Sequence, residues 1–360
     1  MEDLYALAIS EKDANQRAEN WLSSIDPHAM VGSRHHIVPR FHLERFADSR
    51  GQLAVRNRTT GVTTRRAIRD LAVKDFYTTA SEDGELNSSF ESLLNVIEGA
   101  AAEAIRSHLD LEAFAHPREF RDDERLKLDT YAAAQAVRGM RVRRQHELVT
   151  DYGVKLMNQG ILSQRDLRDL RFIPHQNDHI KMFKDLSEGA FVRLADREAR
   201  VVRLDAPLFL ICDEPVVLLG PDSAPAQGLD PQAHAKGTSS EFVHLSRPGA
   251  RRGMDDCEEV VLPLSPRAAL VYGPRGSRGR RPAMPMRFHG SDALDVAEEI
   301  NGLLINSAVE WVASHPEHPT FVDMPFPRPV PIIHIEDGGS PISDQTNADS
   351  RRRPHRLSRS

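Results

Sequence analysis

Residues 34–46 read RHHIVPRFHLERF, and this stretch sets the start of the fold because it places two adjacent histidines shortly before a proline, with Ile37 and Val38 between them. Proline is tolerated in the first turn of a helix, where its missing N–H would have no partner anyway. Pro39 therefore predicts a helix that begins just after the histidine pair. We assign a structural role to the apolar residues that follow: Phe41, Leu43 and Phe46.

The histidine pair is the first candidate for chemistry, because imidazole serves as a metal ligand or a general base near neutral pH. In an extended segment adjacent side chains point to opposite faces, so at most one of the two faces a given site. We expect His36 to be partly buried and His35 to be more accessible. The structural alternative is that one ring bonds a backbone carbonyl and holds the first helical turn. His42 receives no functional role.

The composition is that of an ordinary globular protein, with 40% hydrophobic, 28% charged and 6% aromatic residues among 360. The low aromatic share argues against a carbohydrate or single-strand stacking surface. A formal net charge of −6 does not support a nucleic-acid partner. Local contacts with phosphate backbones could still come from the Arg-rich loop 273–281 and the tail arginines 351–353.

Cysteine usage and apolar patterning indicate a cytoplasmic protein without a membrane partner. Cys212 and Cys257 cannot build a disulfide framework or a four-thiolate metal site. The chain starts Met1-Glu2-Asp3 without a basic signal region, and the apolar run 208–212 is too short to span a bilayer.

Composition along the chain divides it into four parts. Residues 1–32 predict a helical extension, and residues 33–315 a single domain. A proline-rich segment follows at 316–336, and we expect a disordered basic tail at 337–360, because that stretch has no apolar periodicity.

Apolar periodicity predicts an α+β fold. A helical N-terminal half with a β-hairpin precedes a mixed or antiparallel sheet, and a C-terminal helix closes the domain. In the first half we expect a hairpin at 52–64, a helical turn at 68–72, a short strand at 75–79, and helices at 86–109, 118–150 and 174–186. In the second half we expect strands at 190–194, 201–204, 208–212, 216–219, 242–245, 260–264 and 268–272, then a helix at 292–313.

Several segments carry a family resemblance. They are His35-His36-Ile37-Val38-Pro39-Arg40-Phe41-x-Leu43-x-x-Phe46, 51–77, 91–98, Gln135-x-x-Arg138, Asp213-Glu214-Pro215-Val216, Pro263-Leu264-Ser265-Pro266 and 301–308. Together they make the chain resemble a bacterial family known as domain of unknown function 4238. The resemblance implies kinship of fold and no established activity. The chain has Ile211-Cys212 where members usually carry Ser or Thr before the Asp, which puts a role for a hydroxyl there in doubt.

Asp213 is the second candidate for chemistry, because it follows an apolar run that predicts a buried strand. Strand ends often display catalytic carboxylates. The structural alternative is a turn in which Asp213 accepts a hydrogen bond from its own backbone before Pro215.

Two predicted helices add polar residues to this set. Glu98 is the candidate for a buried partner of Arg138, and Gln135 shares a helix face with that arginine. A guanidinium can clamp a phosphate or a carboxylate. The structural alternative is an internal salt bridge.

The remaining motifs point away from well-known enzyme classes. His175 and His179 have the i, i+4 spacing of a zinc site, but Gln176 stands where a metalloprotease needs a glutamate. The chain lacks phosphate-loop and dinucleotide-binding glycine motifs. The segment 263–266 reads as a strand-breaking turn.

Two hypotheses remain. In the first, the protein is an intracellular binding or regulatory module with a buried polar network. In the second, it is a metal-assisted hydrolase of the nuclease type that acts on phosphodiesters with a divalent metal. There His35, His36 and Asp213 would be catalytic, and the supporting residues that bind substrate would be Glu98, Gln135 and Arg138.

Overall fold

A computed structural model provides the structure of the protein. It describes residues 35–71, 73–74, 79–80, 86–87, 89–111, 118–174, 176–220, 242–245, 253–279, 284–329, 331–336 and 340–350. The helix expected at 1–32, most of the strand expected at 75–79 and the tail arginines 351–353 lie outside the described residues.

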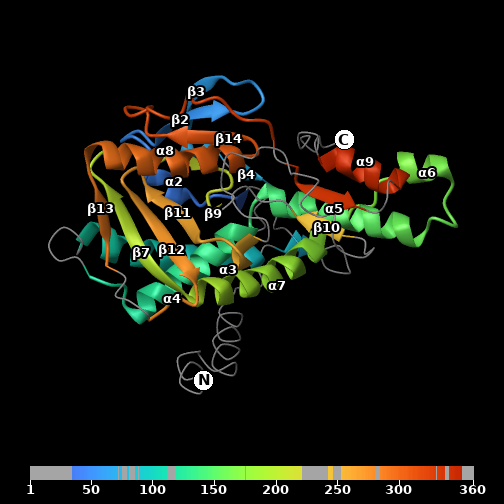
Figure 1. The fold of residues 1–360 in the computed structure, drawn as a ribbon, viewed down its shortest axis with the longest axis horizontal. Coiled ribbons are helices and arrows are strands. Elements are labelled where there is room, and N and C mark those ends of the chain that lie inside the picture. Colours follow the sequence, from blue (N-terminus) through green and yellow to red (C-terminus); the bar gives the residue numbers. More distant parts are fainter. Residues whose placement is uncertain are drawn as a thin grey trace, which may run out of the picture.

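A five-stranded sheet forms the centre of the fold (Figure 1). The strands lie in the order β13 (Met286–Phe288), β7 (Arg197–Leu204), β12 (Ala268–Arg275), β11 (Glu259–Ser265) and β9 (Val217–Leu219). β13 is parallel to β7 and the other pairs are antiparallel, so the sheet is mixed. Side chains alternate between its two faces, and each face contributes to a separate apolar cluster. The α+β class and the mixed sheet are as predicted.

Helices cover one face of this sheet (Figure 1). They are α3 (Ser89–Ile105), continued by a π-helical stretch at Arg106–Leu111, α4 (Asp122–Val137) and α7 (Gln176–Ala195). Their apolar stripes pack on β7, β11 and β12 in one cluster that includes Leu94, Tyr131, Leu194 and Leu270.

The other face packs against α8 (Gly290–Ser307) and the short helix α2 (Arg40–Glu44). A second sheet follows, in the order β3 (Thr63–Ala67), β2 (Gln52–Asn57), β14 (Trp311–Ser314) and β8 (Ile211–Cys212), with all pairs antiparallel. β2 and β3 are the expected hairpin, and Ile68–Asp70 form the expected helical turn. Gly61 at φ 66° allows the tight reversal between the two strands.

A smaller group of elements extends to one side of this body (Figure 1). It contains α5 (Met140–Met157), α6 (Gln164–Asp169), α9 (Pro341–Ser350) and the antiparallel pair β10 (Phe242–Leu245) and β15 (Ile333–Glu336). A separate apolar cluster holds these elements together, and it includes Leu148, Leu167, Ile333 and Ile342. Two further pairings of two-residue strands occur among the residues described: β1 (His35–His36) with β4 (Val73–Lys74), and β5 (Thr79–Ala80) with β6 (Leu86–Asn87).

Four sequence expectations are wrong. The helix expected at 118–150 is two helices, because α4 ends at Val137 and α5 begins at Met140. The strand expected at 190–194 is the end of α7, since a short apolar run does not distinguish strand from helix. The closing helix ends at Ser307, and Trp311 lies in β14.

The fourth concerns the C-terminal segment, where residues 341–350 form α9 instead of disordered chain. The Asn347 side chain of α9 forms hydrogen bonds with the neighbouring strand β15, and apolar periodicity does not reveal such bonds. Asn347 Oδ1 accepts a hydrogen bond from the Ile335 N–H at 2.7 Å, and its Nδ2 donates to the Ile335 carbonyl at 2.8 Å. Within the described part of the chain, no helix combines the length and apolar character needed to cross a membrane.

Candidate functional site

The C-terminal end of α4 brings together three of the residues that the sequence singled out. Gln135 donates from Nε2 to the Ile37 carbonyl at 2.8 Å, and Arg138 donates from Nη1 to Glu98 Oε1 at 2.5 Å. The expected pairing of Glu98 with Arg138 is confirmed. Burial raises the pKa of Glu98, and the charge and hydrogen bond of Arg138 oppose that shift.

His42, to which the sequence analysis assigns no functional role, lies at the centre of this network. It is fully buried, with Nε2 2.6 Å from the Pro263 carbonyl and Nδ1 2.8 Å from the Tyr131 hydroxyl. A carbonyl only accepts, so Nε2 carries the proton and Nδ1 accepts from the tyrosine. Burial lowers the pKa of His42 to about 4. A neutral imidazole thus joins α2 to α4 and β11.

The sequence did hold a signal for this role. His42 and Phe46 stand at i and i+4, so they share the face of α2 that packs inward. Phe41 also lies 5.4 Å from the Tyr131 ring, centroid to centroid. A histidine on an apolar face is expected to be a satisfied core residue.

The histidine pair itself lies in β1, and its partners are Lys74 and Val73 of β4. His36 is half-buried, as expected. The side chain of His35 lies outside the described residues. The two residues are therefore in extended backbone.

Asp213 follows β8 and is fully buried. Its carboxylate accepts hydrogen bonds from a segment far along the chain and not from its own turn. Oδ1 accepts from the Val309 N–H at 2.9 Å and Oδ2 from the Glu310 N–H at 2.6 Å. These two N–H groups belong to the link between α8 and β14. Burial raises the pKa of Asp213 to about 8, with contributions from Glu214 and Glu310, and the two backbone bonds oppose the shift.

Glu214 explains why the helix breaks between α4 and α5. Its Oε1 accepts from the Arg141 N–H at 2.8 Å, which satisfies a free donor at the start of α5. A Cβ placed on Gly139 would lie 2.1 Å from Glu214 Oε2, so a larger residue there would push this carboxylate away from the Arg141 N–H. The Asp213-Glu214 turn thus caps two elements: the carboxylates hold the start of α5 and the start of β14.

A small pocket lies at this break, between the end of α4 and the first turns of α7. Its volume is about 30 Å³, which leaves room for about two water molecules. Such a pocket can hold water or one small group, but it cannot enclose an organic substrate. The lining residues are Val137, Arg138, Gly139, Arg143, His179, Ile180, Met182 and Phe183.

His179 lines this pocket and contacts a histidine of α5. Its Nδ1 lies 3.2 Å from His146 Nδ1, so one ring donates to the other. Burial, with smaller contributions from Arg143 and His146, lowers the pKa of His179 to about 4, and Asp178 opposes the shift. His175, its expected partner, lies outside the described residues.

A possible metal-binding group lies elsewhere, in the loop after β14. Among the described residues, His315, Glu317 and His318 bring three ligand atoms within 4.8 Å of one another. The Glu317 N–H donates to His315 Nδ1 at 3.2 Å, so the neutral ring carries its proton on Nε2. A metal would have to displace this bond. The His-x-Glu-His spacing in the sequence indicates such a group, but these residues were not among the expected site residues.

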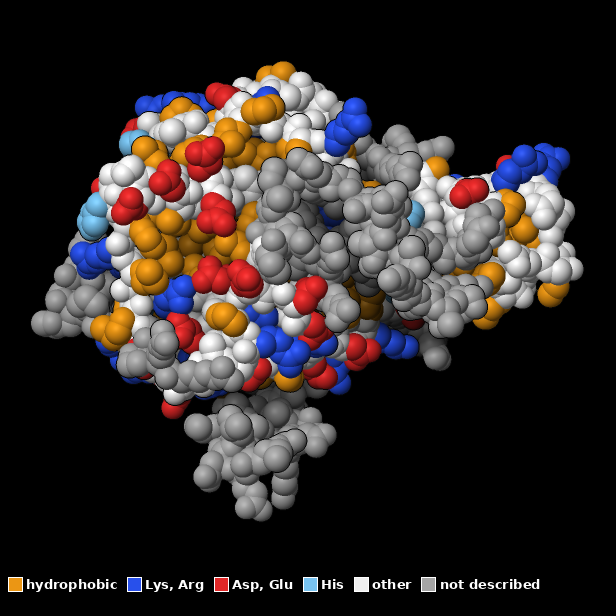
Figure 2. Space-filling model, in the orientation of Figure 1, with side chains coloured by type: hydrophobic (Ala, Val, Ile, Leu, Met, Phe, Trp, Pro, Cys, Tyr) orange, Lys and Arg blue, Asp and Glu red, His pale blue; other side chains and the backbone are white. Residues whose placement is uncertain are grey.

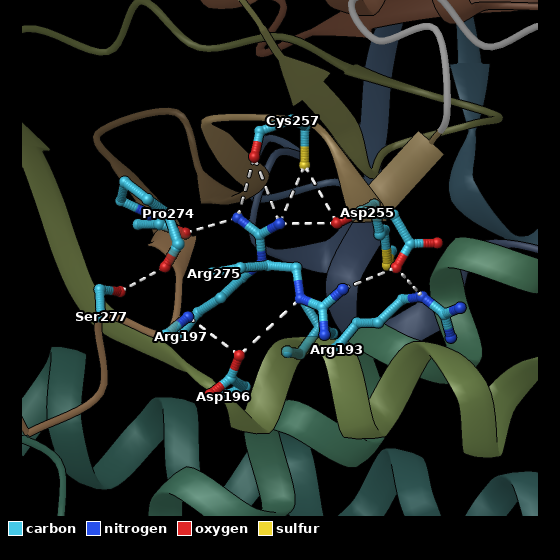
Figure 3. A network of polar contacts seen from close by, with 12 residues as sticks. Arg193, Asp196, Arg197, Asp255, Cys257, Pro274, Arg275 and Ser277 are labelled. Carbon is cyan, nitrogen blue, oxygen red and sulfur yellow. Dashed lines mark hydrogen bonds and ion pairs between the residues drawn. The ribbon is translucent and has the colours of Figure 1, made fainter.

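In its described residues, 273–279, the glycine- and arginine-rich loop contacts the rest of the protein through its arginines (Figure 3). Arg275 contacts Asp255 at 3.0 Å, and Arg278 donates to the Ala195 carbonyl at 3.0 Å. Nearby, the fully buried Arg197 donates to the carbonyls of Gly273 and Met254, each at 2.6 Å. These arginines connect the end of α7 to β12.

On the face in Figure 2, acidic and basic side chains are interspersed among apolar and uncharged ones. This face shows no continuous basic stripe among the residues described there.

Comparison with known proteins identifies a family. Residues 34–318 match the family described as "Protein of unknown function (DUF4238)". No curated protein and no solved structure matches the chain. The match covers most of the chain and includes α4, the α4–α5 break and the Asp213-Glu214 turn. The chain therefore belongs to the DUF4238 family of proteins of unknown function.

Proposed function

We propose that the protein is an intracellular binding or regulatory module and that its signature residues form a structural framework. The observation that carries the proposal is the state of Asp213. Its carboxylate is fully buried, and each oxygen accepts a backbone N–H. A catalytic carboxylate or metal ligand needs an accessible oxygen and a reacting atom within reach.

Two further side chains support the same conclusion. Both ring nitrogens of His42 are engaged, and the Gln135 amide donates to the Ile37 carbonyl. These bonds link α2 and the segment before it to α4 and β11, so their loss affects the arrangement of whole elements. Cys212 and Cys257 are buried free thiols, which supports a reducing compartment such as the cytoplasm.

The second candidate is a metal-assisted hydrolase that acts on phosphodiesters with a divalent metal. The observation in its favour is the group of His315, Glu317 and His318, since two imidazoles and a carboxylate suit a zinc ion. In this case the metal ligands differ from the set of His35, His36 and Asp213 that we expected from the sequence.

One experiment separates the two candidates. The purified protein is incubated with Mg²⁺, Mn²⁺ or Zn²⁺ and with bis(p-nitrophenyl) phosphate or plasmid DNA, and turnover is compared with that of Asp213→Asn. We expect no turnover above the background. Asp213→Asn should lower the free energy of unfolding by about 1–3 kcal/mol, because an amide nitrogen cannot accept the second backbone N–H.

Asp295→Asn, which changes an exposed residue on α8, is the matched control and should leave the free energy of unfolding unchanged. Metal-dependent hydrolysis that disappears in Asp213→Asn, at unchanged stability, would contradict the framework role. Stoichiometric metal that is lost in His36→Ala without unfolding would also count against it.

A further inference from the structure

We infer that the pocket at the α4–α5 break binds a small anionic group, a phosphate or a carboxylate, through Arg143 and His179. The inference rests on the proposed function, a binding module, and adds the chemical class of its ligand. The pocket holds about two water molecules, so it receives the terminal group of a ligand whose remaining part lies outside.

The first argument is an unsatisfied polar atom. His179 is more than nine-tenths buried, and its Nε2 has no hydrogen-bond partner among the described residues. Buried polar groups are almost always hydrogen-bonded, to protein, water or ligand. Since His179 lines the pocket, an occupant of the pocket is the partner that this nitrogen lacks.

The second argument is the charge of the lining. Arg138 and Arg143 line the pocket, and no acidic side chain is among the described residues that line it. Glu98 and Glu147 contact these arginines at 2.5 Å and 3.5 Å, but neither acid lines the pocket. A guanidinium has five N–H donors in a planar fork, so one arginine can serve more than one acceptor.

The third argument concerns the proton on His179. An anion accepts from Nε2–H, which requires that Nδ1 accept a bond from His146 Nδ1–H. The 3.2 Å separation of the two Nδ1 atoms is compatible with that bond. Val137, Met182 and Phe183 make part of the lining apolar, and a charge interaction is stronger in an apolar environment than in water.

Protonation of His179 should become easier when an anion is bound. The charged and titratable groups around it are Arg143 and His146 of α5 and Asp178 of α7. Arg143 and His146 lower its pKa, and Asp178 raises it. A bound anion adds a negative charge and therefore raises the pKa of His179.

The test is a calorimetric titration of the full chain with inorganic phosphate and, separately, with acetate. Arg143→Gln is compared with Arg144→Gln, its matched control. Both arginines contact Glu147, but only Arg143 lines the pocket. We expect Arg143→Gln to weaken binding by about tenfold or more, as for the loss of a charged hydrogen bond, and Arg144→Gln to leave it nearly unchanged.

NMR of the His179 ring gives a second readout. Saturating anion should raise its pKa by about one unit, which corresponds to tenfold tighter binding to the protonated form. If Arg143→Gln fails to fold, His179→Gln replaces it and should also weaken binding. Saturation by phosphate alone identifies a phosphoryl ligand, and saturation by acetate identifies a carboxylate.

Absence of saturable binding at millimolar anion would overturn the inference, as would equal effects of Arg143→Gln and Arg144→Gln. These failures leave the structural framework untouched. Metal-dependent turnover with intact phosphate binding would instead overturn the proposed function and leave the pocket assignment in place.

Discussion

At the scale of single residues, the polar side chains of the signature act by joining distant parts of the chain. His42 bonds Tyr131, 89 positions away, and Pro263, 221 positions away. Asp213 bonds Val309, 96 positions away. The sequence predicted Glu98 with Arg138, because each lies on a recognisable helix face. It could not predict the other partners, because spacing along the chain does not define contacts between separate elements.

The buried His42 predicts a pH dependence of stability. Its folded pKa of about 4 lies below its ordinary value of 6.5, so the unfolded chain binds more protons between these pH values. Stability should therefore be complete above pH 6.5 and fall as the pH drops toward 4. The loss attributed to His42 is about 3 kcal/mol.

Urea unfolding at a series of pH values checks this prediction. In His42→Gln the decline between pH 6.5 and 4 should be smaller than in the wild type by about 3 kcal/mol. His289→Gln, at a position with an exposed side chain, should follow the wild-type curve. Equal slopes in the wild type and His42→Gln would show that His42 does not titrate on unfolding.

At the scale of elements, the bonds of the Asp213-Glu214 turn decide where neighbouring elements begin. α5 starts at Met140 because Glu214 accepts the Arg141 N–H, and the chain turns at Gly139 to let the carboxylate approach. β14 starts at Trp311 because Asp213 holds the N–H groups just before it. The apolar pattern runs through both boundaries, so periodicity alone predicted longer helices.

Gly139→Ala tests this account of the helix break. The new Cβ would lie within 2.3 Å of three Glu214 atoms, so we expect destabilisation by about 2 kcal/mol or more, as for overpacking. Gly153→Ala, inside α5, is the matched control, because a Cβ there meets nothing within 4 Å. It should stabilise the protein by about 1 kcal/mol. Thermal unfolding of both variants measures the difference, and equal effects would refute the proposed contact.

At the scale of the whole molecule, two apolar clusters share one sheet and a third lies apart. The five-stranded sheet contributes to the clusters on both of its faces, so the two should unfold together. The third cluster holds α5, α6, β15 and α9, and it contains few residues. A region with few buried contacts opens at lower free energy than the main core.

Hydrogen exchange can show this division. Ile342→Ala removes a buried side chain from α9 and should accelerate exchange of the α9 amides by about tenfold or more, while β12 amides remain unchanged. Val271→Ala in β12 is the comparison, and it should accelerate exchange of the β12 amides because it weakens the main core. The α9 amides should stay nearly unchanged, because they exchange through a local opening of lower free energy. A matching loss of protection in β12 after Ile342→Ala would mean that the molecule opens as one unit.

The sequence by itself determined the α+β class, the hairpin, the helix α3, most strands of the central sheet and the pairing of Glu98 with Arg138. These follow from periodicity and helix geometry, which act over a few residues. Only the tertiary structure decided the burial of His42, the partners of Asp213 and Glu214, the break before α5, the strand at Trp311 and the helix α9. Each depends on hydrogen bonds between separate elements, from 12 positions apart for α9 to 221 for His42, and local patterns do not encode such contacts.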